Sequence, residues 1–300
     1  MMTNLLLKGL LSGVGMGAIT YLCACLALVA AQNRLIFKPV STITTTPADL
    51  GLAYEDVWLS VLTPQDTVEK LHGWWIRATS SSQKVLLYLH GNGGNISYNL
   101  GPIKSFQEAG FSVLIIDYRG YGRSQGEFPT ESEVYRDAQV AWDYLIEERK
   151  IKPQNIFLYG HSLGGAVAID LGVRKPQAAG IIVENTFTSM RDMMDYLGSF
   201  YQLFPADLIL HQRFDSLSKL RLLQIPLLLI HGTSDRTVPA SMSEKLFKAA
   251  TVPKKLFLVP NANHNNVGVI AGEDYERVVQ DFYQFVLHNQ GQLDLVYNQN

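Results

Sequence analysis

Cysteine is nearly absent from this 300-residue chain, and its only two examples, Cys23 and Cys25, lie within the first thirty residues. The rest of the sequence therefore has no disulfide and no thiolate metal site, which is compatible with a reducing or an oxidising compartment. No His, Asp or Glu cluster has metal-ligand spacing, and no G-x-G-x-x-G follows a predicted strand. We therefore expect neither a metal nor a cofactor.

Charge is also sparse. Charged residues make up 17% of the chain, and the net charge is −2. This balance gives no reason to expect nucleic acid or an acidic polymer as a partner. The sequence contains no low-complexity tract and no internal repeat. With 47% hydrophobic residues, a chain of this length can bury a substantial core in one large domain or two small ones.

One segment carries no charge at all. Residues Leu10–Ala31 (LLSGVGMGAITYLCACLALVAA) lie between Lys8 and Arg34. About twenty apolar residues in a helix span the hydrocarbon core of a bilayer. We therefore predict a transmembrane helix over about residues 10–31, within an N-terminal membrane anchor of residues 1–34. Lys8 and the amino terminus balance Arg34 and Lys38, so the flanking charges predict no orientation.

Two other interpretations of this segment are open. Val29-Ala30-Ala31 is an acceptable cleavage site for a signal peptide, although the apolar run is longer than a usual signal core. A bacterial lipoprotein signal that ends near Cys23 is the third interpretation.

The chain after the anchor divides into a linker and one domain. Residues 35–53, polar and interrupted by proline, predict a linker to a domain of residues 54–290. In that domain short apolar runs alternate with amphipathic ones. We expect strands at 54–62, 71–78, 85–89, 113–116, 156–159, 181–183, 227–230 and 256–259, and helices at 96–109, 131–149, 163–173, 241–249 and 275–288. This order predicts an α/β fold with a doubly wound, mostly parallel sheet and helices on both faces.

The stretch YGHSLGGA, residues 159–166, joins a predicted strand to a predicted helix. Such a turn strains the backbone of its central residue, and the side chains two positions away would collide, so Gly160 and Gly164 stand there. The turn presents the Ser162 hydroxyl above the sheet at a helix N-terminus, where an anion is favoured. Ser162 is therefore the candidate nucleophile, with a purely structural turn as the alternative.

A serine nucleophile needs a base, and the base needs a group that orients it. Ligands bind beyond the carboxyl ends of such strands, and the order along the chain is serine, acid, histidine. Asp235 follows the strand at 227–230, and His264 follows the last strand. We predict them as acid and base. Asp235 could instead cap a helix, and Glu184, at another strand end, is the alternative acid.

Three further histidines, His90, His161 and His231, lie near strand ends but precede the predicted acid or the last strand. They are interpreted as hydrogen-bonded structural residues. An oxyanion needs two N–H donors. The backbone N–H of Leu163 is the first candidate, and that of Asn92, in the glycine-rich run after residues 85–89, is the second.

Five blocks appear in a fixed order: LYLHGNGGNI, IDYRGYGRSQGE, LYGHSLGGAVAI, VENTFTSM and ANHNN. Together they resemble the α/β-hydrolase superfamily over Leu35–Leu287, and within it the membrane-anchored branch of the yeast bud-emergence homologue and the mammalian α/β-hydrolase-domain-containing protein thirteen. The resemblance implies that Ser162, Asp235 and His264 form the triad. Asn266 stands where members often carry Asp, which changes the local charge.

These residues predict a membrane-bound serine hydrolase that cleaves carboxylic ester or thioester bonds through an acyl-enzyme. The expected substrates are small molecules, lipid-like or acylated. Two alternatives are a peptidase or amidase with the same triad, and a membrane-tethered binding module without catalysis. Residues 185–223, named here the lid segment, lack a clear strand. They either form a small lid that lines an acyl pocket or pack on the sheet. The segment is rich in large apolar residues: Phe187, Met190, Met193, Met194, Tyr196, Leu197, Phe200, Tyr201 and Phe204.

Overall fold

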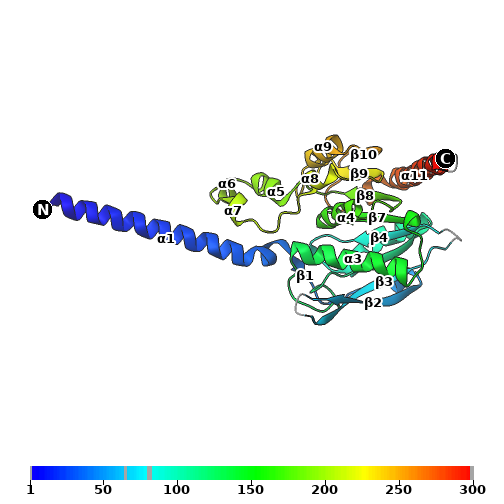
Figure 1. The fold of residues 1–300 in the computed structure, drawn as a ribbon, viewed down its shortest axis with the longest axis horizontal. Helices are drawn as coiled ribbons and strands as arrows, with labels where there is room; N and C mark the ends of the chain where they lie inside the picture. Colours follow the sequence, from blue (N-terminus) through cyan, green and yellow to red (C-terminus); the bar gives the residue numbers. More distant parts are fainter. Residues whose placement is uncertain (1, 64–65, 80–82, 298–300) are drawn as a thin grey trace.

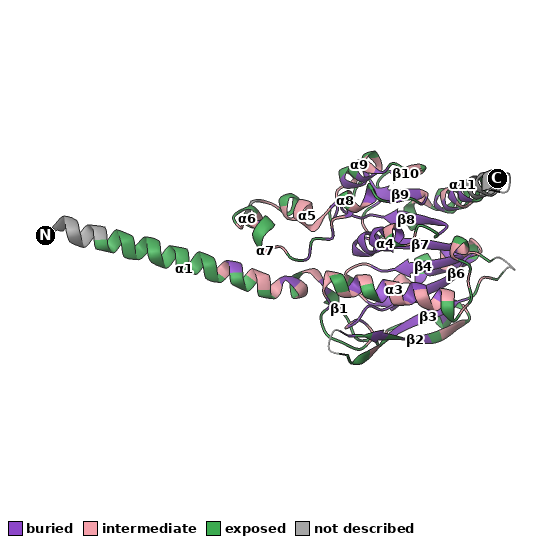
Figure 2. Ribbon diagram, viewed as in Figure 1, coloured by how far each residue is buried: buried purple, intermediate pink, exposed green. Residues whose placement is uncertain are grey.

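A long N-terminal helix, α1 (Met2–Ile36), projects from an α/β domain (Figure 1). The computed structural model describes residues 2–63, 66–79 and 83–297. Most of α1 is exposed, and side chains become buried only toward its C-terminal end, at Cys25 and Gln32 (Figure 2). By length and composition, Lys8–Ile36 is the only described helix able to cross a membrane. The predicted span of residues 10–31 lies inside it.

Eight strands form one sheet in the order β10-β9-β8-β7-β4-β6-β3-β2. The six strands from β10 to β6 are parallel, and β3 and β2 extend the edge as antiparallel strands. The predicted mostly parallel sheet is therefore confirmed. The strands are β2 (Tyr54–Leu62), β3 (Val68–Ile76), β4 (Val85–Leu89), β6 (Ser112–Ile116), β7 (Ile156–His161), β8 (Gly180–Glu184), β9 (Leu227–Gly232) and β10 (Lys254–Val259).

Helices cover both faces of this sheet, as predicted (Figure 1). The α-helices after α1 are α2 (Leu100–Glu108), α3 (Glu131–Glu147), α4 (Leu163–Arg174), α5 (Met190–Leu197), α6 (Ser199–Gln202), α7 (Ala206–Ile209), α8 (Ser216–Leu220), α9 (Ala240–Ala249), α10 (Val267–Ala271) and α11 (Glu273–Tyr297). The 3-10 helices are Pro47–Leu50, Ile96–Asn99 and Pro153–Asn155. The lid segment holds α5 to α8 and no strand.

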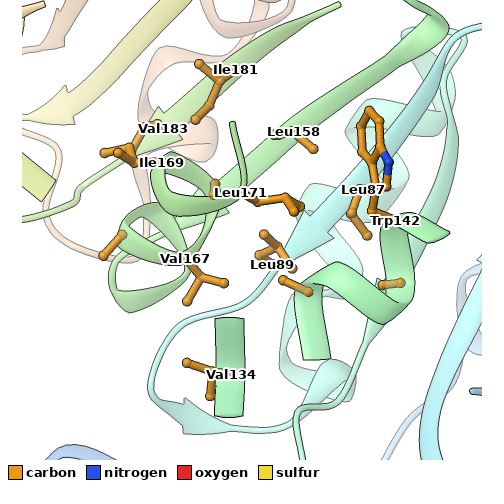
Figure 3. Close-up of a cluster of buried hydrophobic side chains, with 14 of the residues drawn as sticks. Leu87, Leu89, Val134, Trp142, Leu158, Val167, Ile169, Leu171, Ile181 and Val183 are labelled. Atoms are coloured by element: carbon orange, nitrogen blue, oxygen red, sulfur yellow. The ribbon is translucent and has the colours of Figure 1, made fainter. Parts of the chain in front are cut away.

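Alternate residues of each strand divide the core into two layers, because side chains in a strand point to opposite faces. Leu87 and Leu89 face α3 and α4, whereas Leu86 and Tyr88 face α2 and α11. Figure 3 shows the first layer, in which strand residues meet Val134 and Trp142 of α3 and Val167 and Leu171 of α4. Each such buried side chain contributes about 1.5–3 kcal/mol to folding.

Three local features differ from the sequence expectation. Strand β3 begins at Val68, three residues early, because its whole length pairs with β2 from Leu62 onward. The predicted linker contains a 3-10 helix at Pro47–Leu50, at whose start the Thr46 backbone N–H donates to Asp49 Oδ2. Two short strands, β1 (Lys38–Pro39) and β5 (Gly93–Gly94), form a parallel pair. No alternation of side chains marks so short a pair.

Helix α4 lies directly against the end of β4 at Gly164. A Cβ atom at this position would lie 2.0 Å from the carbonyl oxygen of Leu89. Leu89 belongs to β4, which is paired on both sides within the sheet, so its main chain has no room to move aside. The absence of a side chain at Gly164 therefore allows the helix to pack directly on the strand.

We expect Gly164→Ala to lower the free energy of unfolding by about 1–3 kcal/mol or more, because of this overlap with main-chain atoms. Gly101→Ala in α2 is the matched control: nothing lies within 4 Å of its Cβ position, so the change should be neutral or stabilise by up to about 1 kcal/mol. Unfolding of both variants in detergent measures the difference. Equal stability of the two variants would contradict the packing described.

Candidate active site

The turn from β7 into α4 holds Ser162 in a rare backbone conformation, with φ 54° and ψ −120°. Gly160 and Gly164 make this turn feasible, because a Cβ at Gly160 would lie 2.1 Å from the Gly164 carbonyl oxygen. Ser162 is only 8% exposed, yet it lines a cavity at the carboxyl edge of the sheet. The strained, sharply presented serine that the G-x-S-x-G pattern predicts is therefore observed.

The structure brings Ser162, His264 and Asp235 together. His264 Nε2 lies 3.0 Å from Ser162 Oγ, and His264 Nδ1 lies 2.6 Å from Asp235 Oδ2. Ser162 follows β7, Asp235 follows β9 and His264 follows β10. The carboxyl ends of these three parallel strands lie at one edge of the sheet. The hydrogen-bonded chain has the order that nucleophile, base and orienting acid require.

Asp235 is held as a carboxylate by its surroundings. Its Oδ1 accepts hydrogen bonds from the backbone N–H groups of Thr237 and Val238, at 2.8 and 2.9 Å. Burial acts to raise the pKa of the Asp235 carboxyl, but hydrogen bonds from His231, His264 and Val238 outweigh it and hold this pKa well below its usual range. A charged Asp235 is suited to stabilise an imidazolium at His264.

Glu184, the alternative acid, bonds elsewhere. Its Oε2 accepts a hydrogen bond from the hydroxyl of Tyr275, at 2.8 Å, in the buried layer under α11. Burial raises the pKa of the Glu184 carboxyl, although the Tyr275 hydroxyl opposes this. The imidazole contact that the acid needs is made by Asp235.

The three further histidines near strand ends have structural partners. His231 lies 2.7 Å from Ser243 Oγ and 2.9 Å from the carbonyl oxygen of Val238, which supports the Asp235 loop. His90 Nδ1 lies 2.7 Å from the carbonyl oxygen of Gly91. These contacts agree with the structural interpretation. His161 contacts the backbone of His264, the predicted base.

The backbone of His264 is positioned by two side chains. His161 Nε2 lies 2.8 Å from the His264 carbonyl oxygen, and Asn185 Nδ2 donates to the same oxygen at 2.8 Å. Asn185 Oδ1 also accepts from the backbone N–H of Gly232, at 3.0 Å. Asn185 thus ties the His264 loop to the end of β9. Sequence reasoning missed this residue, although its place directly after β8 was a usable signal.

Asn92 and Leu163, the predicted oxyanion donors, line the same cavity as Ser162. The adjoining Gly91 lies so close that a Cβ there would be 3.5 Å from Ser162 Cβ. The Asn92 loop is fixed by its carbonyl oxygen, which accepts from Tyr121 Oη at 2.7 Å. Within the described part of the chain, neither Asn92 nor Leu163 finds an acceptor for its backbone N–H. Both N–H groups therefore lack a backbone acceptor among the described residues, which is compatible with the predicted role.

The cavity has a volume of about 240 Å³ and a mostly apolar wall. Its floor is Ser162, one wall comes from the lid segment, and another comes from the end of α1. None of the lining residues is charged. They are Leu28, Gln32, Leu35, Ile36, Asn92, Ser162, Leu163, Phe187, Met190, Met193, Met194, Leu197, Tyr201, Ile209, Leu210, Thr237 and Val238.

The lid segment combines the two arrangements considered for it. Phe187 is buried, and Met190 and Met193 pack against the core layer that contains α4. Met194 and Tyr201 line the cavity. Across the residues that the structure describes, no three His, Cys, Asp or Glu side chains are grouped to hold a metal ion.

Comparison with known proteins places this geometry in a family. Residues 80–221 match the family described as "Serine aminopeptidase, S33". The chain is 34% identical over 245 residues to protein bem46 of Schizosaccharomyces pombe, a match that covers 79% of each chain. The chain belongs to the α/β-hydrolase family. It is a hydrolase of this family by fold and by sequence, as the resemblance carried by the five sequence blocks implied.

Two further similarities describe this α/β-hydrolase. It is 32% identical over 260 residues to the uncharacterized membrane protein YNL320W of Saccharomyces cerevisiae, which covers 84% of this chain and 88% of that protein. The structure of the esterase Pf2001 from Pyrococcus furiosus has the same fold, with a TM-score of 0.68 at 22% identity, over 83% of this chain and 98% of the other. The apolar helix α1 and the similarity to the membrane protein YNL320W together indicate association with a membrane.

The pKa of His161 generates a stability prediction for the hydrolase. Burial, and then the charge of His264, lower the pKa of the His161 imidazole to about 4. An unfolded histidine titrates near 6.5. His161 therefore contributes stability that is complete above pH 6.5 and is lost as the pH falls toward 4.

We expect His161→Gln to flatten the loss of stability between pH 6.5 and 4, by up to about 3 kcal/mol across this window. The glutamine amide can still donate to the His264 carbonyl. Urea unfolding at a series of pH values measures the slope, with His211→Gln, an exposed histidine, as the control. Parallel slopes for the wild type and His161→Gln would contradict the shifted pKa.

Proposed function

We propose that this α/β-hydrolase cleaves carboxylic ester or thioester bonds of substrates with an apolar acyl chain, while α1 anchors it in a membrane as a single span. The hydrogen-bonded chain from Asp235 through His264 to Ser162, at the floor of an apolar cavity, supports this proposal. A binding module without catalysis would have no need for these two hydrogen bonds.

The reaction takes two steps. Ser162 Oγ attacks the acyl carbon as His264 Nε2 takes its proton, and Asp235 stabilises the imidazolium that forms. The backbone N–H groups of Leu163 and Asn92 bind the oxyanion. His264 then protonates the leaving alcohol or thiol, which leaves an acyl-enzyme. Water, activated by the same imidazole, hydrolyses the acyl-enzyme and restores Ser162.

The cavity favours an ester over an N-terminal peptide. An aminopeptidase binds a charged amino group, which buried apolar walls disfavour unless a carboxylate lies nearby. The cavity wall carries methionine, leucine and phenylalanine side chains, and no carboxylate lies among its lining residues. Methionine side chains adapt to irregular apolar ligands. Such a wall fits an acyl chain.

We expect Ser162→Ala to lower kcat by about 10³–10⁶-fold and Asp235→Asn by about 10³–10⁴-fold, since each removes part of one catalytic unit. Initial rates with 4-nitrophenyl esters of two to sixteen carbons measure this. The wild type should prefer the longer chains. Ser241→Ala, an exposed serine in α9, serves as the control and should keep full activity.

Anilides that carry the same acyl groups as the esters distinguish an amidase or peptidase from an esterase. We expect ester turnover to exceed anilide turnover with the same acyl group. A preference for anilides would favour an amidase, and a preference for acetyl over longer acyl groups would refute the role assigned to the cavity.

A further inference from the structure

The lid segment is fastened along one face of α1. The hydroxyl of Tyr21 donates to the carbonyl oxygen of Leu203 at 2.9 Å, and the Tyr21 ring stacks on Phe204, with centroids 5.9 Å apart. Nearer the C-terminal end of α1, Gln32 Nε2 donates to the carbonyl oxygen of Ile209 at 2.7 Å. Tyr21 and Gln32 are eleven residues apart, about three helical turns, so they share a face. Figure 1 shows α6 and α7 beside α1, away from the sheet.

These contacts fix the depth of the lid segment relative to a bilayer. Lys8 and Arg34 bound an uncharged run that is longer than the roughly 20 residues a bilayer core of about 30 Å needs. If the core begins beside Lys8, it ends near residue 28, and Tyr21 lies about 10 Å inside it. If the core ends beside Arg34, Tyr21 lies farther from the core boundary on the domain side. Under either placement, the lid residues that contact Tyr21 reach the level of the hydrocarbon.

The outer surface of the lid segment is apolar. Five large apolar side chains there are between 43% and 79% exposed, an unusual concentration for a surface in water. Three of its charged side chains pair with one another: Arg191 contacts Asp195 and Asp207. Exposed apolar side chains beside paired charges suit a lipid interface, which has an apolar and a polar layer. We name this patch the lid surface: Tyr196, Leu197, Phe200, Leu203 and Leu208.

The cavity opens beside this surface. Leu197 is 59% exposed and also lines the cavity, so the cavity wall continues into the lid surface. The opposite wall is α1 itself, through Leu28, Gln32, Leu35 and Ile36. The end of α1 is also bonded to the oxyanion loop, because Asn92 Nδ2 donates to the Ile36 carbonyl oxygen at 2.8 Å. The membrane helix is therefore a part of the candidate active site.

We propose that the lid surface inserts into the lipid bilayer and that the acyl chain of the substrate enters the cavity directly from the hydrocarbon, between the lid segment and α1. This inference rests on the proposed function and on α1 as a membrane span. The partner of the lid surface is the acyl region of the bilayer. The substrate class is a long-chain acyl ester or thioester that resides in the membrane.

Depth is tested in the full chain reconstituted in phosphatidylcholine vesicles. Phe200→Trp places a conservative fluorophore in the lid surface, and the wild-type spectrum, with its four tryptophans, is subtracted. We expect phosphatidylcholine brominated on its acyl chains to quench the added emission at least twofold, and aqueous iodide to have little effect. Quenching by iodide alone would place the lid surface in water or against another protein and overturn the proposal.

Entry of the substrate from the bilayer is tested with a double variant, Leu203→Asp/Leu208→Asp. Neither leucine is among the residues that line the cavity. In vesicles we expect turnover of 4-nitrophenyl palmitate, which partitions into the bilayer, to fall at least tenfold. Turnover of water-soluble 4-nitrophenyl butyrate should stay within twofold. Leu287→Asp is the control: Leu287 is 42% exposed on α11, at the opposite end of the molecule from α1 (Figure 1). It should leave both rates unchanged.

The outcomes separate the two proposals. Unchanged palmitate turnover in the double variant would overturn entry from the bilayer and leave the esterase function in place. A wild type that hydrolyses neither ester would refute the esterase function itself. An equal fall with both esters would mean that the double variant had damaged the site, and the Phe200→Trp quenching, with the lid segment intact, then decides.

Discussion

The strained turn at Ser162 is the constraint on which the rest of the site depends. At φ 54° its backbone is held in a conformation that side chains rarely adopt, and such strain persists only where the surroundings enforce it. Here the enforcement is steric and comes from the sheet: Gly160 and Gly164 let α4 begin directly against β4 and β7. The turn carries the hydroxyl to the edge where the loops after β9 and β10 bring the carboxylate and the imidazole.

Much of this arrangement was predictable because it follows from local patterns. Short apolar runs between amphipathic ones specify a parallel sheet, and the carboxyl ends of parallel strands must meet at one edge. Ser162, Asp235 and His264 therefore stand close together for a topological reason that the order of elements already contained. The two faces of the core follow from the same strands, because alternate side chains point in opposite directions.

The remainder was not predictable, because it depends on contacts between distant parts of the chain that leave no periodic signal. The β1–β5 pair involves only main-chain atoms of two short segments. The bonds that Asn185 makes to Gly232 and His264 become visible only when three loops are assembled. Nothing in an apolar N-terminal run reveals that its final turns bond a loop 56 residues away, as Ile36 and Asn92 do. A membrane anchor and a cavity wall both consist of apolar residues, so the sequence does not distinguish them.

The central claim is that Ser162 is a nucleophile activated by His264. Intact mass measurement after exposure of the folded full chain to a fluorophosphonate tests it most directly, since such a probe bonds only an activated serine. We expect one adduct per chain, mapped to the peptide that contains Ser162, and much slower labelling in His264→Ala. An unlabelled wild type, or an adduct on a different residue, would contradict it.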